Sequence, residues 1–435
     1  MGELLSKLAY YGGKPSVTRS LNCQWPQMAL SHLEETEDLL HRGILSCYEE
    51  GLDVITRLEK KLKLISGAKH ALYVNSGTSA LLLAFYAANL SFGDEVIVPA
   101  YTYPATITPL FHFGVKIVLA DIEEDSYNIS VDAIKRNVTD KTKMVVVTHM
   151  RGLPVDMEPL SKFCKSRGIF LVEDASHAIG ATYQGIHVGN WGDCGCFSLS
   201  ADKLVSGGTA GFLVTNDDRI YQKVHAAING PGREGGMDFS IENYCTDDLK
   251  GIVETGIGFN FKSSPITAAI IAAQLDLLEE SIKARQNNLL GLTEMLKKSH
   301  GIIPPKERMN STRGGWYGYR PFYDKQAFKG LKKEAFINLM KAEGAEVSGS
   351  GIKPFYKYPV VQFPELQKIV SFGRMGGDMF RFDIAGFRNV EINNLRTLKF
   401  PVSNSRDALE VYAQYVNAIN KIYSCIDVLP KEIFE

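Results

Sequence analysis

The chain has 435 residues, of which 45% are hydrophobic and 22% charged, so it can form a large folded core and does not belong to the disordered class. Its 48 basic and 49 acidic residues are interspersed and leave a formal charge of −1, which argues against a nucleic-acid partner. Seven cysteines without a CxxC spacing favour a reduced, cytoplasmic protein without a structural metal, and the absence of a long apolar run predicts no membrane association.

The elements are predicted from the spacing of apolar residues. Residues 1–30 are rich in Gly, Pro and aromatic residues without periodicity, which predicts an N-terminal arm that packs on another part of the protein. Helical spacing begins near Ser31, and short β-branched runs then alternate with helical segments up to about Ile282. The runs read as strands are residues 95–100, 116–122, 143–150, 168–175 and 211–215. This alternation predicts an α/β fold with a mainly parallel sheet in a large domain over residues 31–285.

The last third of the chain has a different pattern. From Ala268 the apolar positions recur at helical spacing for many turns, which predicts one long helix that leaves the large domain. Residues 317–323 are typical of a strand, and the segments that begin at Leu331 and Ala408 are typical of helices. We therefore expect a smaller C-terminal α+β domain over residues 286–435.

The first motif with chemical content is Asn75-Ser76-Gly77-Thr78-Ser79, where an apolar strand gives way to small polar residues and then to a helix. The free N–H groups and hydroxyls at a helix N-terminus can bind an anion such as phosphate. By itself this segment is also typical of an ordinary helix cap and turn.

Two further motifs follow in the same block. An apolar strand ends in Glu173-Asp174, at the end of a strand where open α/β sheets bind ligands, and a carboxylate there can hold a cationic ring nitrogen. Lys203 lies 29 residues after Asp174 among small residues and glycines. Such a lysine can be desolvated, which lowers its pKa and frees the amine to attack an aldehyde. The order of these motifs in one α/β block favours a pyridoxal phosphate site.

At this point the chain resembles a known family, the DegT/DnrJ/StrS sugar aminotransferases of the aspartate-aminotransferase fold (fold type I). The resemblance covers about residues 35–285 and rests on six segments in family order: NSGTSAL, GDEVIVPAYTYPAT, THMRGLPVDM, LVEDASHAIGATYQG, GNWGDCGCFSLSADKLVSGG and GIGFNFKSSPITAAIIAAQL. It implies a pyridoxal 5'-phosphate-dependent transaminase that uses glutamate or glutamine to aminate a keto sugar, a nucleotide sugar or an inosose-like cyclitol, in the biosynthesis of amino sugars, antibiotics or surface polysaccharides.

The resemblance also implies roles for individual residues. Lys203 would hold the cofactor covalently and move a proton, Asp174 would pair with the ring nitrogen, and His177 would lie near the phenolic oxygen of the cofactor. The remaining cofactor contacts would come from Gly77, Thr78, Tyr103, Ser198 and Asn260. Asn260 would reach the phosphate of the partner subunit, so a homodimer with shared active sites is implied.

The chain departs from the family pattern on the substrate side of the predicted site. Where many members have Gly-Glu-Gly-Gly after the lysine, this chain has Gly208-Thr209-Ala210-Gly211, and where many have Asn-x-Arg it has Asn260-Phe261-Lys262. Because Lys cannot reproduce a bidentate Arg contact, these motifs do not identify the acceptor substrate.

Two alternatives to aminotransfer remain at this stage. Some relatives with the lysine catalyse a dehydration that yields an aminohydroxybenzoate, and segments of this chain resemble those enzymes and the inosose aminotransferases about as closely as the nucleotide-sugar enzymes. Relatives with His in place of the lysine remove a hydroxyl group instead, and Lys203 argues against that branch. A non-catalytic sensor is the second alternative, and the set of Lys203, Asp174 and Ser198 argues against it.

Overall fold

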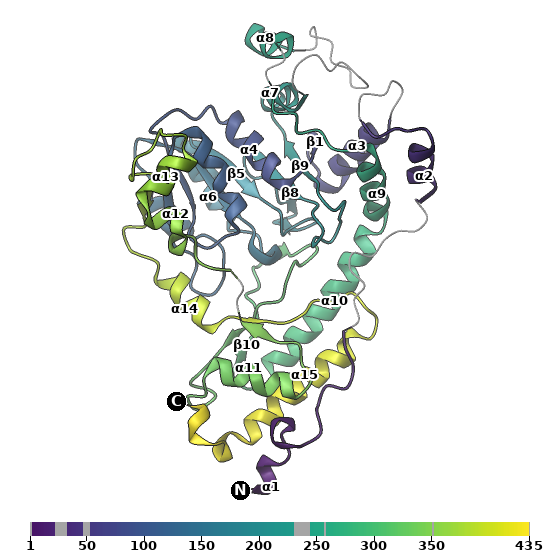
Figure 1. The fold of residues 1–435 in the computed structure, drawn as a ribbon, viewed down its shortest axis with the longest axis vertical. Coiled ribbons are helices and arrows are strands. Elements are labelled where there is room, and N and C mark those ends of the chain that lie inside the picture. Colours follow the sequence, from purple (N-terminus) through teal and green to yellow (C-terminus); the bar gives the residue numbers. More distant parts are fainter. Residues whose placement is uncertain are drawn as a thin grey trace.

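The computed structural model describes residues 2–21, 33–46, 53–229, 244–255, 258–349 and 352–434. It consists of an upper α/β part and a lower part of helices and short strands, joined along helix α10, and both chain termini lie in the lower part (Figure 1). Cys23 and Cys47 lie outside the described residues.

An eight-stranded sheet forms the centre of the upper part. Its strands lie in the order β1 (His70–Val74), β9 (Gly211–Thr215), β8 (Cys194–Ser198), β5 (Phe170–Asp174), β4 (Thr142–Thr148), β2 (Glu95–Pro99), β3 (Lys116–Ala120) and β14 (Phe380–Phe382). Neighbouring strands from β8 to β14 are parallel, and β9 is antiparallel to both of its neighbours. The predicted α/β fold with a mainly parallel sheet is confirmed.

Helices cover the sheet, and the ends of several are determined by capping residues. Helix α4 (Gly77–Ala87) begins after Ser76, whose side chain accepts the Ser79 N–H, a cap that contributes on the order of 1 kcal/mol. Helix α3 (Val54–Ser66) buries Leu58 and Leu62 and ends at a left-handed Gly67. The other helices of the upper part that precede α9 are α2 (Leu33–His41), α5 (Val131–Asn137), α6 (Met157–Arg167), α7 (Asp218–Asn229) and α8 (Asp247–Thr255).

The helix predicted to run on from Ala268 is two helices in the structure. Helix α9 (Pro265–Asp276) ends at Leu277, and α10 (Leu278–Lys297) begins there. The Leu277 N–H donates to the carbonyls of Gln274 and Leu275, three and two residues earlier, and not to the carbonyl four residues earlier as in an α-helix. This tightens the last turn of α9. Gln274 in that turn donates to the Ser206 carbonyl at 2.6 Å and accepts the Ser206 N–H at 3.0 Å, so the loop after β8 is tied to α9.

The lower part packs around α10, α11 (Lys333–Ala342) and α15 (Ala408–Ser424), with a hydrophobic cluster of its own. Its short strands are β10 (Ile302–Ile303), β12 (Phe322–Tyr323), β13 (Ser348–Gly349) and β15 (Leu398–Lys399), while β6 (Thr182–Tyr183), β7 (Ile186–His187) and β11 (Ser311–Thr312) form a separate small sheet. The strand expected over residues 317–323 is confined to β12, with isolated bridges from Tyr319 to Phe400 and from Phe322 to Thr397.

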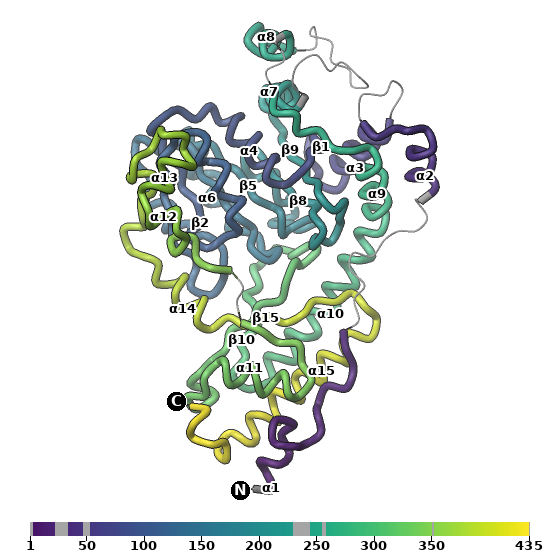
Figure 2. Tube along the Cα trace, in the orientation of Figure 1, coloured from purple at the N-terminus to yellow at the C-terminus, as the bar shows by residue number. Residues whose placement is uncertain are grey.

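The described part of the N-terminal arm, with α1 (Gly2–Leu5), lies beside α15 in the lower part (Figure 2). Leu8, Val17 and Leu21 join its hydrophobic cluster. The fully buried Glu343 carboxylate accepts the N–H groups of Ala9 and Ser16 at 2.8 and 2.9 Å and fixes the arm.

One segment of the C-terminal third returns to the upper part. Helices α12 (Pro359–Gln362), α13 (Pro364–Val370) and α14 (Arg388–Arg396) flank β14, and Phe355, Met379 and Val390 belong to the hydrophobic cluster of the large sheet. The proposed division at residue 285 therefore separates β14 from the sheet that it extends.

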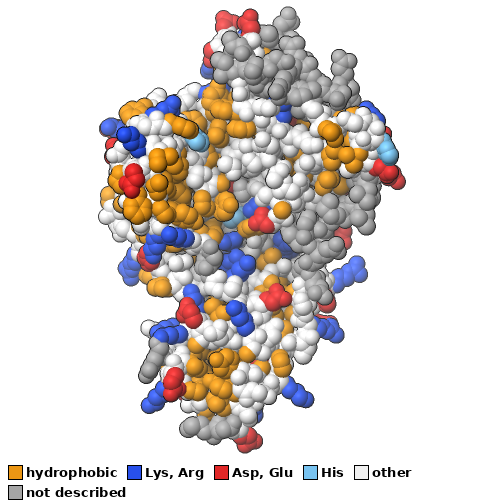
Figure 3. Space-filling model, in the orientation of Figure 1, with side chains coloured by type: hydrophobic (Ala, Val, Ile, Leu, Met, Phe, Trp, Pro, Cys, Tyr) orange, Lys and Arg blue, Asp and Glu red, His pale blue; other side chains and the backbone are white. Residues whose placement is uncertain are grey.

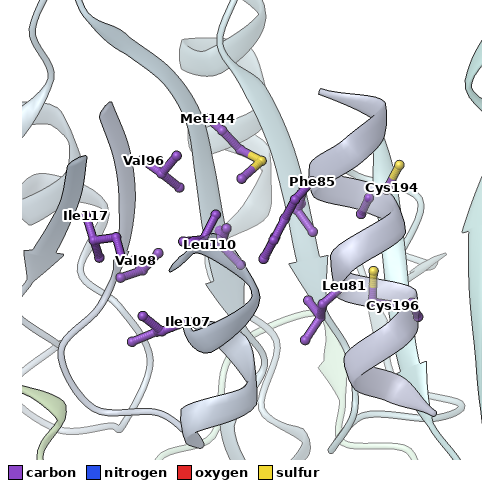
Figure 4. Close-up of a cluster of buried hydrophobic side chains, with 14 of the residues drawn as sticks. Leu81, Phe85, Val96, Val98, Ile107, Leu110, Ile117, Met144, Cys194 and Cys196 are labelled. Atoms are coloured by element: carbon purple, nitrogen blue, oxygen red, sulfur yellow. The ribbon is translucent and has the colours of Figure 1, made fainter. Parts of the chain in front are cut away.

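Cys194 and Cys196 lie in β8, which packs against helix α4, and they belong to the same hydrophobic cluster as Leu81 and Phe85 of that helix (Figure 4). Burial raises the pKa of both thiols well above their usual value. They are packing residues. Among the described residues, no helix combines the length and the apolar character that crossing a membrane requires.

Candidate functional site

One edge of the large sheet collects the chemically active residues. Strands β2, β4, β5 and β8 run parallel and end at this edge, and β1 has the same direction because β9 is antiparallel to both β1 and β8. The loops that follow these strands line a cavity of about 260 Å³. Of the predicted residues, it includes Gly77, Thr78, Tyr103, Asp174, His177, Ser198 and Lys203.

The start of α4 forms the anion-binding end of the cavity. Ser76 caps the Ser79 N–H at 3.0 Å, which leaves the first-turn N–H groups of Gly77 and Thr78 for a ligand. A Cβ atom on Gly77 would lie 2.8 Å from the Cβ of Ser198, so only glycine fits between the helix and the end of β8. The Ser198 hydroxyl lies 3.1 Å from that of Ser200 and faces the same space.

Asp174 supplies a carboxylate held in a fixed orientation and only 4% exposed. Its Oδ1 accepts the Ser176 N–H at 3.1 Å, and its Oδ2 accepts the Thr106 hydroxyl at 2.7 Å. Because the single Thr106 proton goes to Asp174, Thr106 must accept from Thr102, which in turn accepts from Thr148. Three threonines thus form a directed chain that ends on the carboxylate.

Glu173 precedes Asp174 in β5 and points to the opposite face, as alternation along a strand requires. It is fully buried and binds His149 Nε2 at 2.9 Å, and it also accepts the N–H groups of Gly189, Trp191 and Gly192. Glu173 therefore stabilises the loop and is not available to a ligand.

Lys203 is only 9% exposed. Its Nζ lies 3.9 Å from the centre of the Tyr317 ring and 3.8 Å from Asp202 Oδ1. Burial lowers the pKa of its ammonium group, although Asp202 and Asp174 oppose the shift. This lysine has the desolvated setting that a nucleophilic amine needs.

His177 stacks on Tyr317 with ring centres 4.0 Å apart, and its buried Nδ1 has no hydrogen-bond partner among the described residues. Burial, followed by the charges of Lys203 and Arg151, holds the pKa of His177 well below its usual value, so the ring is neutral. An orphaned ring nitrogen at a cavity wall is a natural contact for a polar ligand atom.

The two remaining predicted residues lie differently. Tyr103 lines the cavity but is 62% exposed. Asn260 does not line the cavity; it is exposed and has a left-handed backbone with φ of 55°. Its neighbour Phe261 accepts the Asn75 N–H at 2.9 Å, which places the segment next to the anion-binding end.

Together these residues fit pyridoxal phosphate. The phosphate suits the α4 terminus, a cationic ring nitrogen suits Asp174, an aldehyde suits Lys203, and a phenolic oxygen suits the neutral His177.

Sequence reasoning missed Thr106 and Tyr317. Thr106 lies in PAYTYPAT, a segment used only for its tyrosine, and Tyr317 comes from a part of the chain far from the cofactor motifs. The hydroxyl of Tyr317 donates to Asp202, so it closes the lysine side of the cavity. No local spacing identifies such a contact.

The model of the DegT/DnrJ/EryC1/StrS aminotransferase family matches residues 30–370. A Micromonospora echinospora protein, named as an L-glutamine:3-amino-2,3-dideoxy-scyllo-inosose aminotransferase, is 28% identical over 351 residues, or 81% of each chain.

Two solved structures show the same fold. DesI, determined in the presence of its TDP-sugar product, has a TM-score of 0.75 and 25% identity, and the match covers 97% of both chains. The Escherichia coli GDP-4-keto-6-deoxy-D-mannose-3-dehydratase with bound hydrated PLP has a TM-score of 0.73 and 20% identity, covering 93% of this chain and 99% of the dehydratase. Since the family model spans most of the sequence, the chain belongs to the DegT/DnrJ/EryC1/StrS aminotransferase family and is a pyridoxal-phosphate-dependent transaminase.

Proposed function

We propose that this transaminase moves an amino group from glutamate or glutamine to a keto carbon of a sugar, nucleotide sugar or cyclitol. The main support is the desolvated Lys203, which lines the same cavity as the fixed Asp174 carboxylate. The similarity to an inosose aminotransferase and to DesI supports a polyhydroxylated acceptor.

In this proposal the chain's own residues hold the phosphate and the ring nitrogen of the cofactor. Gly77, Thr78 and Ser198 bind the phosphate through backbone N–H groups and a hydroxyl. Asp174 holds the ring nitrogen in its protonated form. Bound pyridoxal phosphate supplies an electron-withdrawing ring that stabilises negative charge on the reacting carbon of the substrate.

Lys203 then acts twice. Its lowered pKa leaves a larger fraction of free amine near neutral pH, which favours covalent attachment of the cofactor. Once displaced by a substrate amine, the same nitrogen takes a proton from one carbon and returns it to another. Tyr317 and Asp202 restrict the positions that this amine can reach.

The covalent assignment is tested by reducing the loaded protein with borohydride and mapping the modified peptide by mass spectrometry. We expect a visible absorption band in the wild type and a pyridoxyl group on Lys203, with no labelled peptide in Lys203→Ala. Labelling of another lysine would show that the assignment is wrong.

Aminotransfer is tested by adding glutamate or glutamine to the loaded enzyme in a single turnover. Loss of the visible band in step with release of the keto acid is expected, followed by its return when a keto cyclitol or keto sugar is added. If the band persists with every donor while a hydroxylated substrate loses water, the enzyme is a dehydratase. If neither reaction occurs, the protein is a sensor.

We also propose that the enzyme is a homodimer in which Asn260 serves the phosphate of the partner subunit. Its exposure outside the cavity, next to the anion-binding end, supports this role. Mixing Lys203→Ala with Asn260→Ala protomers tests it, because a mixed dimer would then contain one intact site and regain activity. If Asn260 serves its own subunit, no mixture exceeds the activity of the Asn260→Ala protein.

A further inference from the structure

Next to the cofactor cavity lies a group of basic side chains that the proposed chemistry does not use. Arg151 follows β4 and Arg320 precedes β12, and both line a small pocket that adjoins the cavity. Nη1 of Arg320 and Cδ of Arg151 lie 3.3 and 3.4 Å from the point that a Cβ on Gly318 would occupy, so the two side chains approach each other across Gly318. Burial lowers the pKa of Lys399, and Arg320 and Arg151 are close enough to add to this shift.

Neither arginine has a carboxylate within ion-pair distance among the residues that the structure describes. The acids on this side are used elsewhere, since Asp125 pairs with Lys306 at 2.7 Å and Glu123 pairs with Arg308 at 2.7 Å. Arg320 donates to the Tyr319 carbonyl at 3.1 Å, which uses one of its five N–H groups.

Placing two unpaired guanidinium groups side by side is unfavourable without a ligand. Arg151 is largely buried, and burial together with Arg151 lowers the pKa of Arg320 to about 10. Arg151 also has a left-handed backbone with φ of 57°, which is rare for a non-glycine residue and is often found at binding sites. Figure 3 shows Lys and Arg side chains at the waist between the upper and lower parts of the molecule.

The arginines are offset from the reacting atoms. Tyr317 lines the cavity beside Lys203, whereas Arg151 and Arg320 do not line it. The Arg151 guanidinium carbon lies 5.5 Å from the centre of the same ring. A group bound by these arginines is therefore separated from the reacting carbon by several bonds, unlike the α-carboxylate of an amino-acid donor, which is attached to it.

We propose that Arg151 and Arg320 bind a carboxylate or phosphate group carried by the keto acceptor, at a position remote from the carbon that is aminated. This inference rests on the proposed aminotransfer and narrows its acceptor to an anionic sugar or cyclitol. Two arginines that line the same small pocket can together give an oxyanion several charge-assisted hydrogen bonds.

The site itself is tested by titrating inorganic phosphate into the cofactor-loaded enzyme in a calorimeter, since the cofactor then occupies the other phosphate site. We expect saturable binding that weakens by about 30-fold or more in Arg151→Met and in Arg320→Met. Lys306→Met is the matched control. It also removes a positive charge from this pocket, but Asp125 already neutralises the charge of Lys306. Binding that is absent in the wild type, or equally lost in the control, would overturn the proposal. Melting temperatures verify that each variant is folded.

The role of the site is tested in the two half-reactions. Fructose 6-phosphate and 5-ketogluconate are compared with neutral fructose as acceptors for the aminated enzyme. A preference for the anionic ketones that both arginine variants reduce, with the donor half-reaction unchanged, supports the proposal. If the variants use glutamate less well and keep the wild-type acceptor preference, the arginines bind the amino donor and the proposal is refuted. Failure of all acceptors in the wild type counts against the proposed function, and the phosphate titration then decides on the site alone.

Discussion

Replacing Thr106 by valine tests whether the threonine chain maintains the Asp174 carboxylate. Thr106 and Asp174 are almost fully buried, and their hydroxyl–carboxylate bond is 2.7 Å long. Valine keeps the shape of the side chain but cannot donate, and a hydrogen bond to a charged group contributes about 1.5–3 kcal/mol. For 435 residues the entropy of unfolding is about 0.9 kcal/mol per degree, so the melting temperature should fall by about 2–3 °C.

The measurement is thermal unfolding of the cofactor-free protein, followed by circular dichroism. Thr106→Ser keeps the hydroxyl and should melt near the wild type. In an Asp174→Asn background the charge is absent, so the same valine substitution should cost less than half as much. An equal cost in both backgrounds would show that the methyl packing of Thr106 matters and that the bond to Asp174 does not, which would refute the reasoning.

Three further predictions concern the phosphate end, the histidine and the arm. Gly77→Ala should weaken cofactor binding about 5- to 150-fold in equilibrium dialysis, because the new Cβ would lie 2.8 Å from the Cβ of Ser198. The control is Gly251→Ala, also in a helix, where the new Cβ has nothing within 4 Å and cofactor binding should be unchanged. The pKa of His177 is lowered, so only the unfolded chain takes up this proton as the pH falls below about 6.5. The free energy of unfolding should therefore decrease as the pH is lowered. In urea titrations at pH 5.5, His177→Gln should reduce this loss of stability by about 1.4 kcal/mol, and an unchanged loss would contradict a neutral ring. Glu343→Ala should release the N-terminal arm and speed its cleavage by trypsin, because its carboxylate binds arm N–H groups and Lys421; a cleavage rate like that of the wild type would show that apolar contacts suffice.

Strands β2, β3, β4, β5 and β9 could be predicted because each is almost wholly buried and therefore reads as a short apolar run, whereas β8 and the half-exposed β14 were not among the predicted strands. The mainly parallel arrangement of these strands also predicted much of the site, because parallel strands end at one edge of the sheet and the motifs that follow them must meet there. Alternation along β5 also explains why two adjacent carboxylates have different roles, with Asp174 at the cavity and Glu173 bound to His149.

The contacts that complete the site follow from packing between distant parts of the chain. Tyr317 lies beside His177 and Lys203 because the segment before β12 crosses the cavity, and its local pattern indicated only a strand. Residues 380–382 join the large sheet as β14 although they follow the lower part in sequence. Periodicity describes which face of an element is apolar, and it contains no information on which remote segment covers that face.

Cofactor binding and substrate recognition in this enzyme differ in the same way, since one depends on consecutive strands and the other on packing between distant segments. The cofactor contacts predicted within one subunit come from a single block between Gly77 and Lys203, where strand order fixes their arrangement. The changed residues Thr209 and Ala210 do line the cavity, as their position after the lysine suggested. The two arginines beside it, however, are Arg151 in the upper part and Arg320, which lies far later in the sequence. Under the role proposed for these arginines, acceptor recognition depends on how the lower part packs against the sheet edge, and substitutions at that contact should change specificity without affecting cofactor binding.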